Sequence, residues 1–208
     1  MSSEPAPLAA EDSPLAAQWR AAQAEADLMR RAQAGETEAL SALVVSWQER
    51  IYNLMLRLVR DPTMAADLTQ EAFARAIDRL AYYRAEAAPF TWMFRLATNV
   101  GLSHLRQVKR RRTGGFPATE GTSFEERLPA QGASASETLE RKEDRQQVTA
   151  ALARLDEEQR TLLVLRDMEG MDYQAMAEML EVPMGTLKSR LFRARLALRE
   201  LLKDYMGG

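Results

Sequence analysis

The sequence predicts an all-α fold, in which two small helical domains are joined by a flexible acidic linker. Apolar residues recur at steps of three and four along residues 38–60, 62–80 and 91–112, which is the period of an amphipathic helix. The same period returns beyond residue 148. Residues 113–136 separate the two helical segments, lack any period and are rich in Gly, Pro, Ser and Thr. This pattern is typical of two domains on a tether.

Changes of composition set the expected domain boundaries. Residues 1–24 are rich in Ala, Pro and Ser, and we expect them to form a mobile leader. Residues 25–112 form the first predicted domain, and residues 113–136 form the linker. The second predicted domain covers residues 137–206.

Residues that cap helices indicate where several helices begin and end. Gly35 predicts the end of a short first helix, and Thr37 predicts the N-cap of the next. Asp61 followed by Pro62 predicts an N-cap with proline at the first helical position. Asp172 is expected to cap a helix of the second domain. The helix after Pro62 is expected to bury Leu68, Ala72, Phe73, Ala76 and Ile77.

Composition argues against an enzyme. The chain has no cysteine, and His104 is its only histidine, so thiolate chemistry and sites built on two imidazoles are excluded. It contains no glycine-rich phosphate loop, no HExxH and no GxSxG motif. We therefore expect no catalytic residues, no metal and no cofactor. No apolar run is long enough to span a bilayer and the acidic N-terminal residues do not fit a signal peptide, so we expect a cytoplasmic protein without membrane insertion.

Charge is strongly segregated although the net charge is only −2. Residues 106–112 and 186–203 are basic, whereas residues 113–140 are acidic. Two basic patches on either side of an acidic connector suggest two contacts with a polyanion. Solvated helix faces are the simpler alternative.

Residues 172–195 carry the strongest local pattern. Small Ala177 and apolar Val182 fit the crossing and the turn of a helix-turn-helix, whose second helix enters the major groove of DNA. The second helix would begin near Met184 and expose a cationic face. An amphipathic helical hairpin is the alternative. The exposed residues suited to bases and phosphates are Thr186, Lys188, Ser189, Arg190 and Arg193.

An aromatic cluster precedes the first basic patch and consists of Tyr82, Tyr83, Phe90, Trp92 and Phe94. Aromatic rings beside cations can hold unstacked bases, although aromatic residues at helical spacing more often belong to a core. An acidic patch on the same domain, around Asp67 and Glu71, fits a basic protein partner or a solvated helix face.

Together these blocks resemble the extracytoplasmic-function (ECF) sigma factors of bacterial RNA polymerase. Residues 67–80 (DLTQEAFARAIDRL) resemble sigma region 2.2, and residues 90–112 resemble regions 2.3 and 2.4. Residues 148–198 resemble region 4. The resemblance implies an alternative sigma factor that binds core polymerase, recognises the −35 and −10 promoter elements and helps to melt DNA for a dedicated regulon. A cognate anti-sigma factor is a further expectation from the family.

The resemblance also implies a role for individual residues. Contacts to the β′ clamp helices of the polymerase would come from Asp67, Gln70 and Glu71. Contacts to the −10 element would come from Tyr82, Tyr83, Phe90, Thr91, Trp92, Asn99, Arg106, Lys109 and Arg110. Contacts to the −35 element would come from Thr186, Lys188, Ser189, Arg190, Arg193 and Arg195. The helix near residues 162–168 would lie close to the β flap.

Two other classes compete with this interpretation. A two-domain helix-turn-helix regulator would bind duplex DNA without melting it, and it would need neither the aromatic cluster nor the acidic patch. A nucleic-acid-modifying enzyme would need a metal or nucleophile site, which the sequence does not offer.

Overall fold

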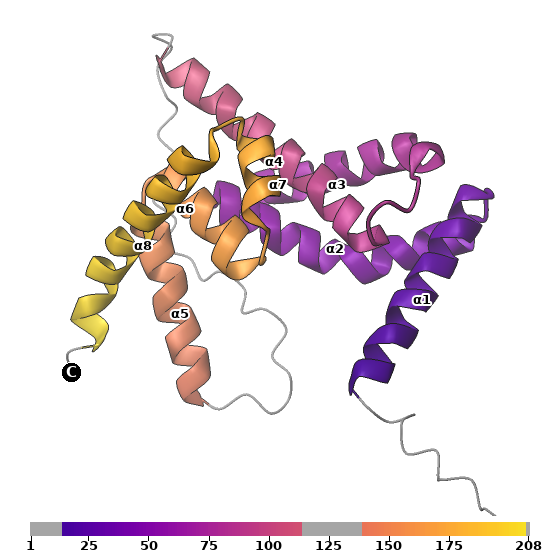
Figure 1. Ribbon diagram of the computed structural model, residues 1–208, viewed down its shortest axis with the longest axis horizontal. Helices are drawn as coiled ribbons and strands as arrows, with labels where there is room; N and C mark the ends of the chain where they lie inside the picture. The colour runs from indigo at the N-terminus through magenta and orange to yellow at the C-terminus, as the bar shows by residue number, and fades with distance from the viewer. Residues whose placement is uncertain (1–13, 114–138, 207–208) are drawn as a thin grey trace, which may run out of the picture.

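The computed structural model describes residues 14–113 and 139–206, and every regular element within these two ranges is helical (Figure 1). The helices are α1 (Pro14–Gln33), α2 (Thr37–Val59), α3 (Pro62–Arg79), α4 (Pro89–Thr113), α5 (Leu139–Arg154), α6 (Glu157–Leu163), α7 (Tyr173–Leu180) and α8 (Met184–Met206). A 3-10 turn (Leu80–Tyr82) follows α3, and a π-helical turn (Val164–Met168) follows α6. The predicted all-α class is confirmed. Nearly all of the predicted linker lies outside the described residues.

The first helix begins at Pro14, so residues 14–24 of the predicted leader are helical. Proline is well tolerated in the first turn, and the alanine-rich run that follows has high helix propensity. A tertiary contact also holds α1, because the indole Nε1 of Trp47 donates a hydrogen bond to Glu25 at 2.6 Å. The apolar period of this segment is weak, so the sequence pattern did not predict a helix here. The helix is stabilised by its own helix propensity and by its contact with α2.

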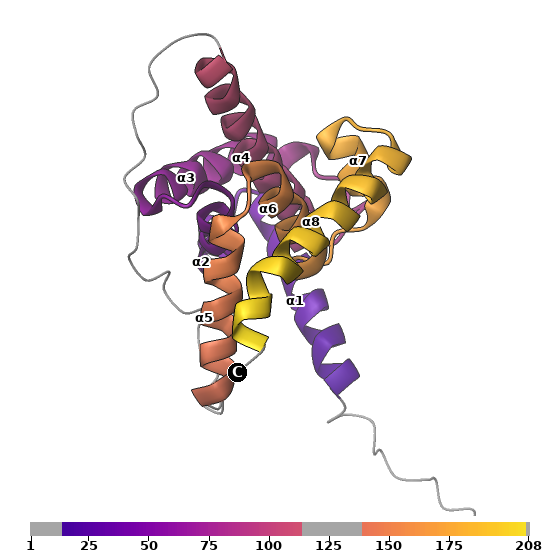
Figure 2. The same cartoon turned by 90° about the vertical axis from the view of Figure 1, so that its left-hand side faces the viewer.

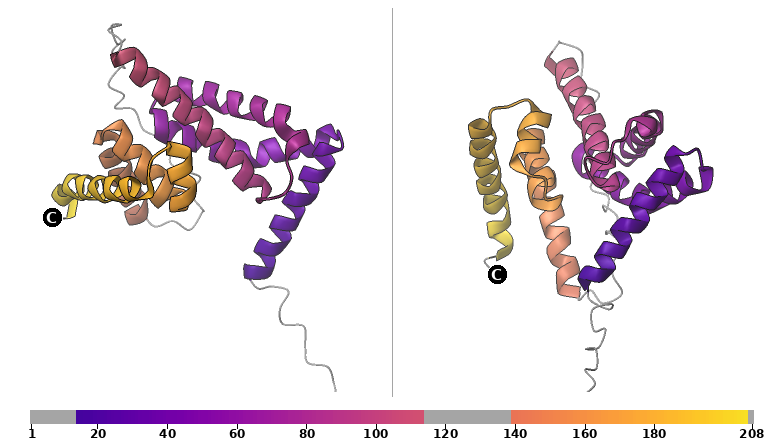
Figure 3. Two further views of the ribbon diagram at one scale, coloured as in Figure 1. Left: turned by 45° about the horizontal axis from the view of Figure 1, so that its top comes forward. Right: turned by 45° about the vertical axis from the view of Figure 1, so that its right-hand side comes forward.

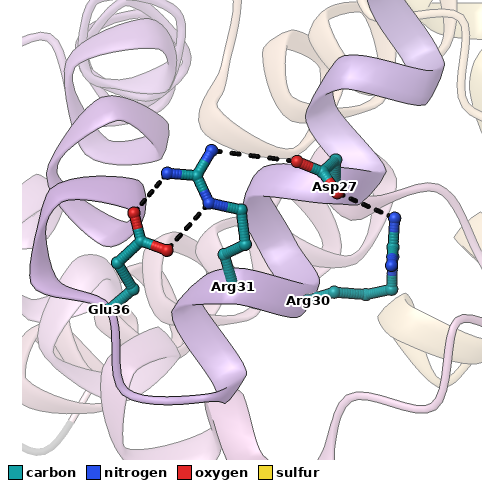
Figure 4. A network of polar contacts seen from close by, with 4 residues as sticks. All are labelled: Asp27, Arg30, Arg31 and Glu36. Atoms are coloured by element: carbon teal, nitrogen blue, oxygen red, sulfur yellow. Dashed lines mark hydrogen bonds and ion pairs between the residues drawn. The ribbon is translucent and has the colours of Figure 1, made fainter.

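An ion-pair network closes the turn between α1 and α2 (Figure 4). Gly35 has φ +93° and follows the end of α1, as predicted. The predicted N-cap Thr37 is instead the first residue of α2, and Glu36 occupies the cap position. The Glu36 carboxylate binds the Arg31 guanidinium rather than the backbone of α2, and this hydrogen bond lowers the pKa of Glu36. Arg31 also lies 3.8 Å from Asp27.

The caps predicted for α3 and α7 are present. The Asp61 side chain accepts a hydrogen bond from the backbone N–H of Met64 at 2.9 Å, with Pro62 at the start of α3. Asp172 accepts in the same way from Ala175 at 2.8 Å. One predicted core residue of α3 is wrong, because Ile77 is 48% exposed. The buried stripe runs through Leu68, Ala72 and Ala76, and the next position lies about 100° further around the helix.

Helix α2 lies at the centre of the molecule and packs against α1, α3 and α4. Its stripe of Leu43, Trp47, Ile51, Leu54 and Leu58 is buried, as predicted. It also packs against α6 and the π-helical turn, so the two halves share one continuous apolar cluster. Figure 2 shows α5 beside α8, and Figure 3 shows α5 to α8 grouped next to α2 and α4.

The helices on the two sides of the predicted linker are therefore in contact with each other in this structure. Among the described helices, none combines the length and apolar character needed to cross a membrane.

Candidate nucleic-acid and protein interfaces

The helix-turn-helix predicted from residues 172–195 is formed by α7 and α8. Glu181 adopts a left-handed conformation (φ 57°) and ends α7, and the N–H of Val182 bonds back to the carbonyl of Ala177 at 3.0 Å. Ala177 is buried where the helices meet, and Leu187 and Leu191 are buried on the inner side of α8. The opposite side of α8 is consequently turned toward solvent.

Four of the predicted −35 residues lie on this outer side and make few polar interactions within the protein. Lys188, Ser189 and Arg193 are exposed, and Thr186 is half-buried. The Ser189 hydroxyl donates a hydrogen bond to the Thr186 carbonyl at 2.9 Å. Neither Lys188 nor Arg193 forms an ion pair with any residue in the described part of the chain. Their charges are available to an external anion.

The other two predicted −35 residues are held by carboxylates. Arg190 lies 2.6 Å from Glu158 of α6. Arg195 forms a two-pronged contact with Asp167, in which its Nε is 3.0 Å from the carboxylate. The hydrogen bonds to Asp167 raise the pKa of Arg195. Sequence reasoning placed both arginines on the correct helix but did not predict the acidic partners, which come from more than 25 positions away in sequence.

The aromatic cluster is divided between surface and core. Tyr82 is 77% exposed, whereas Phe94 is buried. Tyr83 and Trp92 pack together with ring centroids 5.4 Å apart, and the Tyr83 hydroxyl donates to the Ala87 carbonyl at 2.6 Å. Burial raises the pKa of Tyr83. These contacts fix the loop between α3 and α4.

Phe90, in the first turn of α4, lies beneath a cation that the sequence analysis missed. The Cζ of Arg50 on α2 is 3.5 Å from the centroid of the Phe90 ring. Trp47 meets the same ring edge-on at 6.2 Å, and Phe94 lies 6.0 Å from it. Arg50 precedes Phe90 by 40 residues, so no spacing rule connects the two positions. Thr91 is exposed next to Phe90.

Farther along α4, Asn99, Arg106, Lys109 and Arg110 are exposed. Arg106 Nη2 donates a hydrogen bond to the carbonyl of Met179 at 2.8 Å, and its Nη1 lies 3.8 Å from Glu181. The basic end of α4 therefore contacts the turn of the helix-turn-helix. This contact joins two surfaces that the sequence analysis treated as separate.

The acidic patch on α3 faces solvent. Asp67, Gln70 and Glu71 are exposed, whereas Leu68 and Thr69 are buried on the inner side of the helix. The Thr69 hydroxyl donates to the Ala65 carbonyl at 2.7 Å, which satisfies a buried polar group within the helix. Glu71 pairs with Arg75 at 2.5 Å, so Asp67 carries the unbalanced charge of the patch.

A helical unit with an acidic outer face and an aromatic, basic helix, linked to a helix-turn-helix, defines the sigma-factor class. The family model "Sigma-70 region 2" matches residues 43–112, and the model "Sigma-70, region 4" matches residues 145–198. The chain belongs to the sigma-70 family of RNA polymerase sigma factors and, within it, to the ECF group.

Named relatives agree with this assignment. The chain is 34% identical to the RNA polymerase sigma-H factor of Pseudomonas aeruginosa over 181 residues, which cover 86% of this chain and 94% of the relative. It is 34% identical to the ECF RNA polymerase sigma-E factor of Escherichia coli K12, over 82% of this chain and 90% of the relative. Among solved structures, the sigma factor RpoE of Bartonella quintana, in complex with the anti-sigma factor NepR, has a TM-score of 0.55 at 26% identity. That likeness covers 78% of this chain and 96% of the solved one.

The family resemblance predicted from the sequence is thus confirmed. The protein is a sigma factor that recognises promoters and initiates transcription with RNA polymerase, and it is not itself an enzyme.

Proposed function

We propose that the two halves of this sigma factor divide promoter recognition between them. Residues 25–112 act as region 2, which binds the polymerase clamp and the −10 element. Residues 137–206 act as region 4, which binds the −35 element, and residues 113–136 connect the two. The observation that carries the proposal is the cationic outer side of α8, where Lys188 and Arg193 have no ion-pair partner among the described residues.

The outer side of α8 reads the −35 element. The recognition helix of a helix-turn-helix inserts its N-terminal half into the major groove, and Thr186, Lys188 and Ser189 occupy that half of α8. Arginine can bind guanine with two hydrogen bonds, whereas lysine and hydroxyl groups suit phosphates and base edges. Arg190 and Arg195 join this surface once DNA phosphates compete with Glu158 and Asp167 for their guanidinium groups.

The first turn of α4 and the loop before it capture the −10 element. The exposed ring of Tyr82 can stack against an unpaired nucleotide base. The packed pair of Tyr83 and Trp92 holds the loop in a fixed conformation. Phe90 is held by Arg50, whose charge attracts the phosphates of the same strand. Farther along the strand, backbone and bases would meet Thr91, Asn99, Arg106, Lys109 and Arg110. Flipping a base requires a few kcal/mol, which stacking against aromatic rings can return.

Asp67, Gln70 and Glu71 bind the clamp helices of the polymerase β′ subunit. Their common exposure on α3 supports this role, since an acidic face repels DNA and suits a basic protein surface.

Region 4 contacts the β flap near the π-helical turn. Because residues 162–165 are buried, the apolar surface available there is Met168, which is 41% exposed.

An anti-sigma factor controls the protein, and both act in the cytoplasm, where the polymerase works. The related sigma factor RpoE of Bartonella quintana was solved with the anti-sigma factor NepR, which supports a partner of this kind. The promoters of the genes in its dedicated regulon share their own −35 and −10 sequences.

Transcription by core polymerase across a randomised promoter library tests the proposal. The expected result is a set of discrete start sites that share both upstream elements. Arg193→Ala should relax or weaken the −35 preference, whereas Arg199→Ala removes an equal charge farther along α8 and should change it little. If no transcripts appear and the protein alone binds duplex DNA specifically, it is a helix-turn-helix regulator and the proposal fails.

A further inference from the structure

One face of α1 lies against the elements that carry the proposed −10 surface. Glu25, Met29 and Gln33 are spaced by four residues, so they share one side of the helix. Met29 is fully buried, and Glu25 accepts the hydrogen bond from the indole of Trp47, which in turn supports the ring of Phe90. The last residue of this row, Gln33, ends α1 where the helix packs against the 3-10 turn after α3.

The side chain of Gln33 bridges the 3-10 turn that carries Tyr82. Its amide nitrogen Nε2 donates a hydrogen bond to the carbonyl of Leu80 at 3.0 Å and another to the carbonyl of Tyr83 at 2.9 Å. Both bonds can form at once, because an amide nitrogen carries two protons. Tyr82, whose side chain is 77% exposed, lies between the two bonded residues in the sequence. Gln33 therefore holds the backbone on both sides of the ring that the proposed function assigns to an unstacked base.

The position of Gln33 is itself fixed by other contacts. The ion pairs of Arg31 with Glu36 and Asp27 close the turn that follows α1 (Figure 4). The loop beyond the 3-10 turn needs external support, because Ala85 adopts φ 57°, a left-handed conformation that residues other than glycine seldom take. A fixed donor at the end of α1 supplies part of that support.

We propose that Gln33 is a positioning residue for −10 recognition, which fixes the turn at residues 80–83 and so presents the Tyr82 ring to an unstacked base. This inference deepens the proposed function of the loop and rests on it. Gln33 acts without touching DNA, because a turn that is already ordered loses less conformational entropy when the base binds. Helix α1, which lies outside the residues matched by the region 2 model, thereby contributes to promoter recognition.

The mobility of the turn in the full-length protein alone tests the first step. Because the chain contains no cysteine, Ala81→Cys places a single thiol at an exposed position of the turn, where it takes a nitroxide spin label. Gln33→Met keeps an unbranched side chain but removes the donor, and the electron paramagnetic resonance spectrum should show a more mobile label. Gln33→Lys restores a donor and should return the mobility toward the parental value. Gln23→Met makes the same change at an exposed position of α1 and should leave the spectrum unchanged.

Binding of DNA by the sigma–polymerase complex tests the second step. Gln33→Met should weaken binding of a single-stranded non-template −10 oligonucleotide by about threefold to tenfold, the effect of one or two neutral hydrogen bonds. Binding of a duplex that carries only the −35 element should stay parental. Tyr82→Ala should also weaken binding of the −10 strand. Because Gln33 acts through Tyr82, the double variant should bind no more weakly than Tyr82→Ala alone, whereas a general loss of stability would give losses that add.

Parental label mobility in Gln33→Met would overturn the proposal, and so would losses that add in the double variant. Failure of the proposed function gives a different result. Parental affinity of Tyr82→Ala for the −10 strand would remove the whole loop from the −10 surface. A loss of affinity in Tyr82→Ala without one in Gln33→Met would remove only the positioning role.

Discussion

The guanidinium of Arg50 covers the ring of Phe90, with the Arg50 Cζ 3.5 Å from the ring centroid. The contact joins the middle of α2 to the first turn of α4, and Trp47 supports the ring from its edge. It gives the first turn of the proposed base-capture helix a fixed position and a positive charge at its surface. A residue that is remote in sequence is thereby part of the proposed −10 surface.

Arg50→Ala should therefore affect both stability and promoter opening. A cation over an aromatic ring at an exposed site contributes about 0.5–1 kcal/mol, and we expect the free energy of unfolding in urea to fall by about that amount. Open-complex formation, followed by permanganate reactivity of unpaired thymines near −10, should slow. Glu49→Ala, at the exposed neighbouring position, serves as the control. Opening at the parental rate in Arg50→Ala would remove Arg50 from the −10 surface.

Arg190 and Glu158 should affect −35 binding in opposite directions. Arg190→Ala should cost about 1–3 kcal/mol on the preferred −35 sequence if the side chain reads a base. Glu158→Gln removes the negative charge that holds Arg190 at 2.6 Å and should tighten DNA binding several-fold. Binding of the sigma–polymerase complex to −35 variants measures both effects. An equal loss on every −35 sequence for Arg190→Ala would show a phosphate contact instead of base reading.

Charge reversal of the acidic patch tests the polymerase surface. Asp67→Lys combined with Glu71→Lys should weaken binding to core polymerase at least tenfold, because two attractive charges become repulsive at a basic partner. Glu38→Lys combined with Glu49→Lys, at two exposed acids on α2, controls for the change in net charge. Fluorescence anisotropy of labelled protein titrated with core polymerase gives the affinity, and circular dichroism checks folding. Parental affinity in the double variant would refute the clamp assignment.

Gly101 lies where α4 packs tightly against the side chains of α2. A Cβ at this position would lie 2.9 Å from Leu58 Cδ1 and 3.2 Å from Met55 Sδ, and both neighbours are fully buried. Overpacking costs about 1–3 kcal/mol, which outweighs the gain of up to about 1 kcal/mol from replacing a helical glycine. Gly101→Ala should therefore lower the free energy of unfolding.

Gly185→Ala is the matched comparison for Gly101→Ala. Apart from the adjacent residues and the backbone of α8 itself, no atom lies within 4 Å of the added methyl group at that position, so the substitution should be neutral or stabilising. Urea unfolding of the two variants distinguishes crowding from helix propensity. A Gly101→Ala protein as stable as its parent would mean that Leu58 and Met55 can move aside.

The local pattern of residue types determined where most helices lie and which residues form much of the proposed interface surface. The period of three and four placed Leu43, Trp47 and Ile51 in the core of α2, because one face of a helix must be buried. Asp61 and Asp172 marked helix starts, since a short acidic side chain satisfies free backbone N–H groups. The burial predicted for Ile77 was wrong, because the stripe of Leu68, Ala72 and Ala76 leaves the next position about 100° further around the helix.

Only the tertiary structure decided which residues meet across the chain. Arg50 lies over Phe90, Glu158 binds Arg190, and Arg57 pairs with Glu169, over separations of 32 to 112 residues. Helical periodicity fixes the side of its own helix on which a residue lies, and it carries no information about what packs against that side. The composition of residues 113–136 predicted a tether, but the contact between the halves depends on the complementarity of two surfaces that folding brings together.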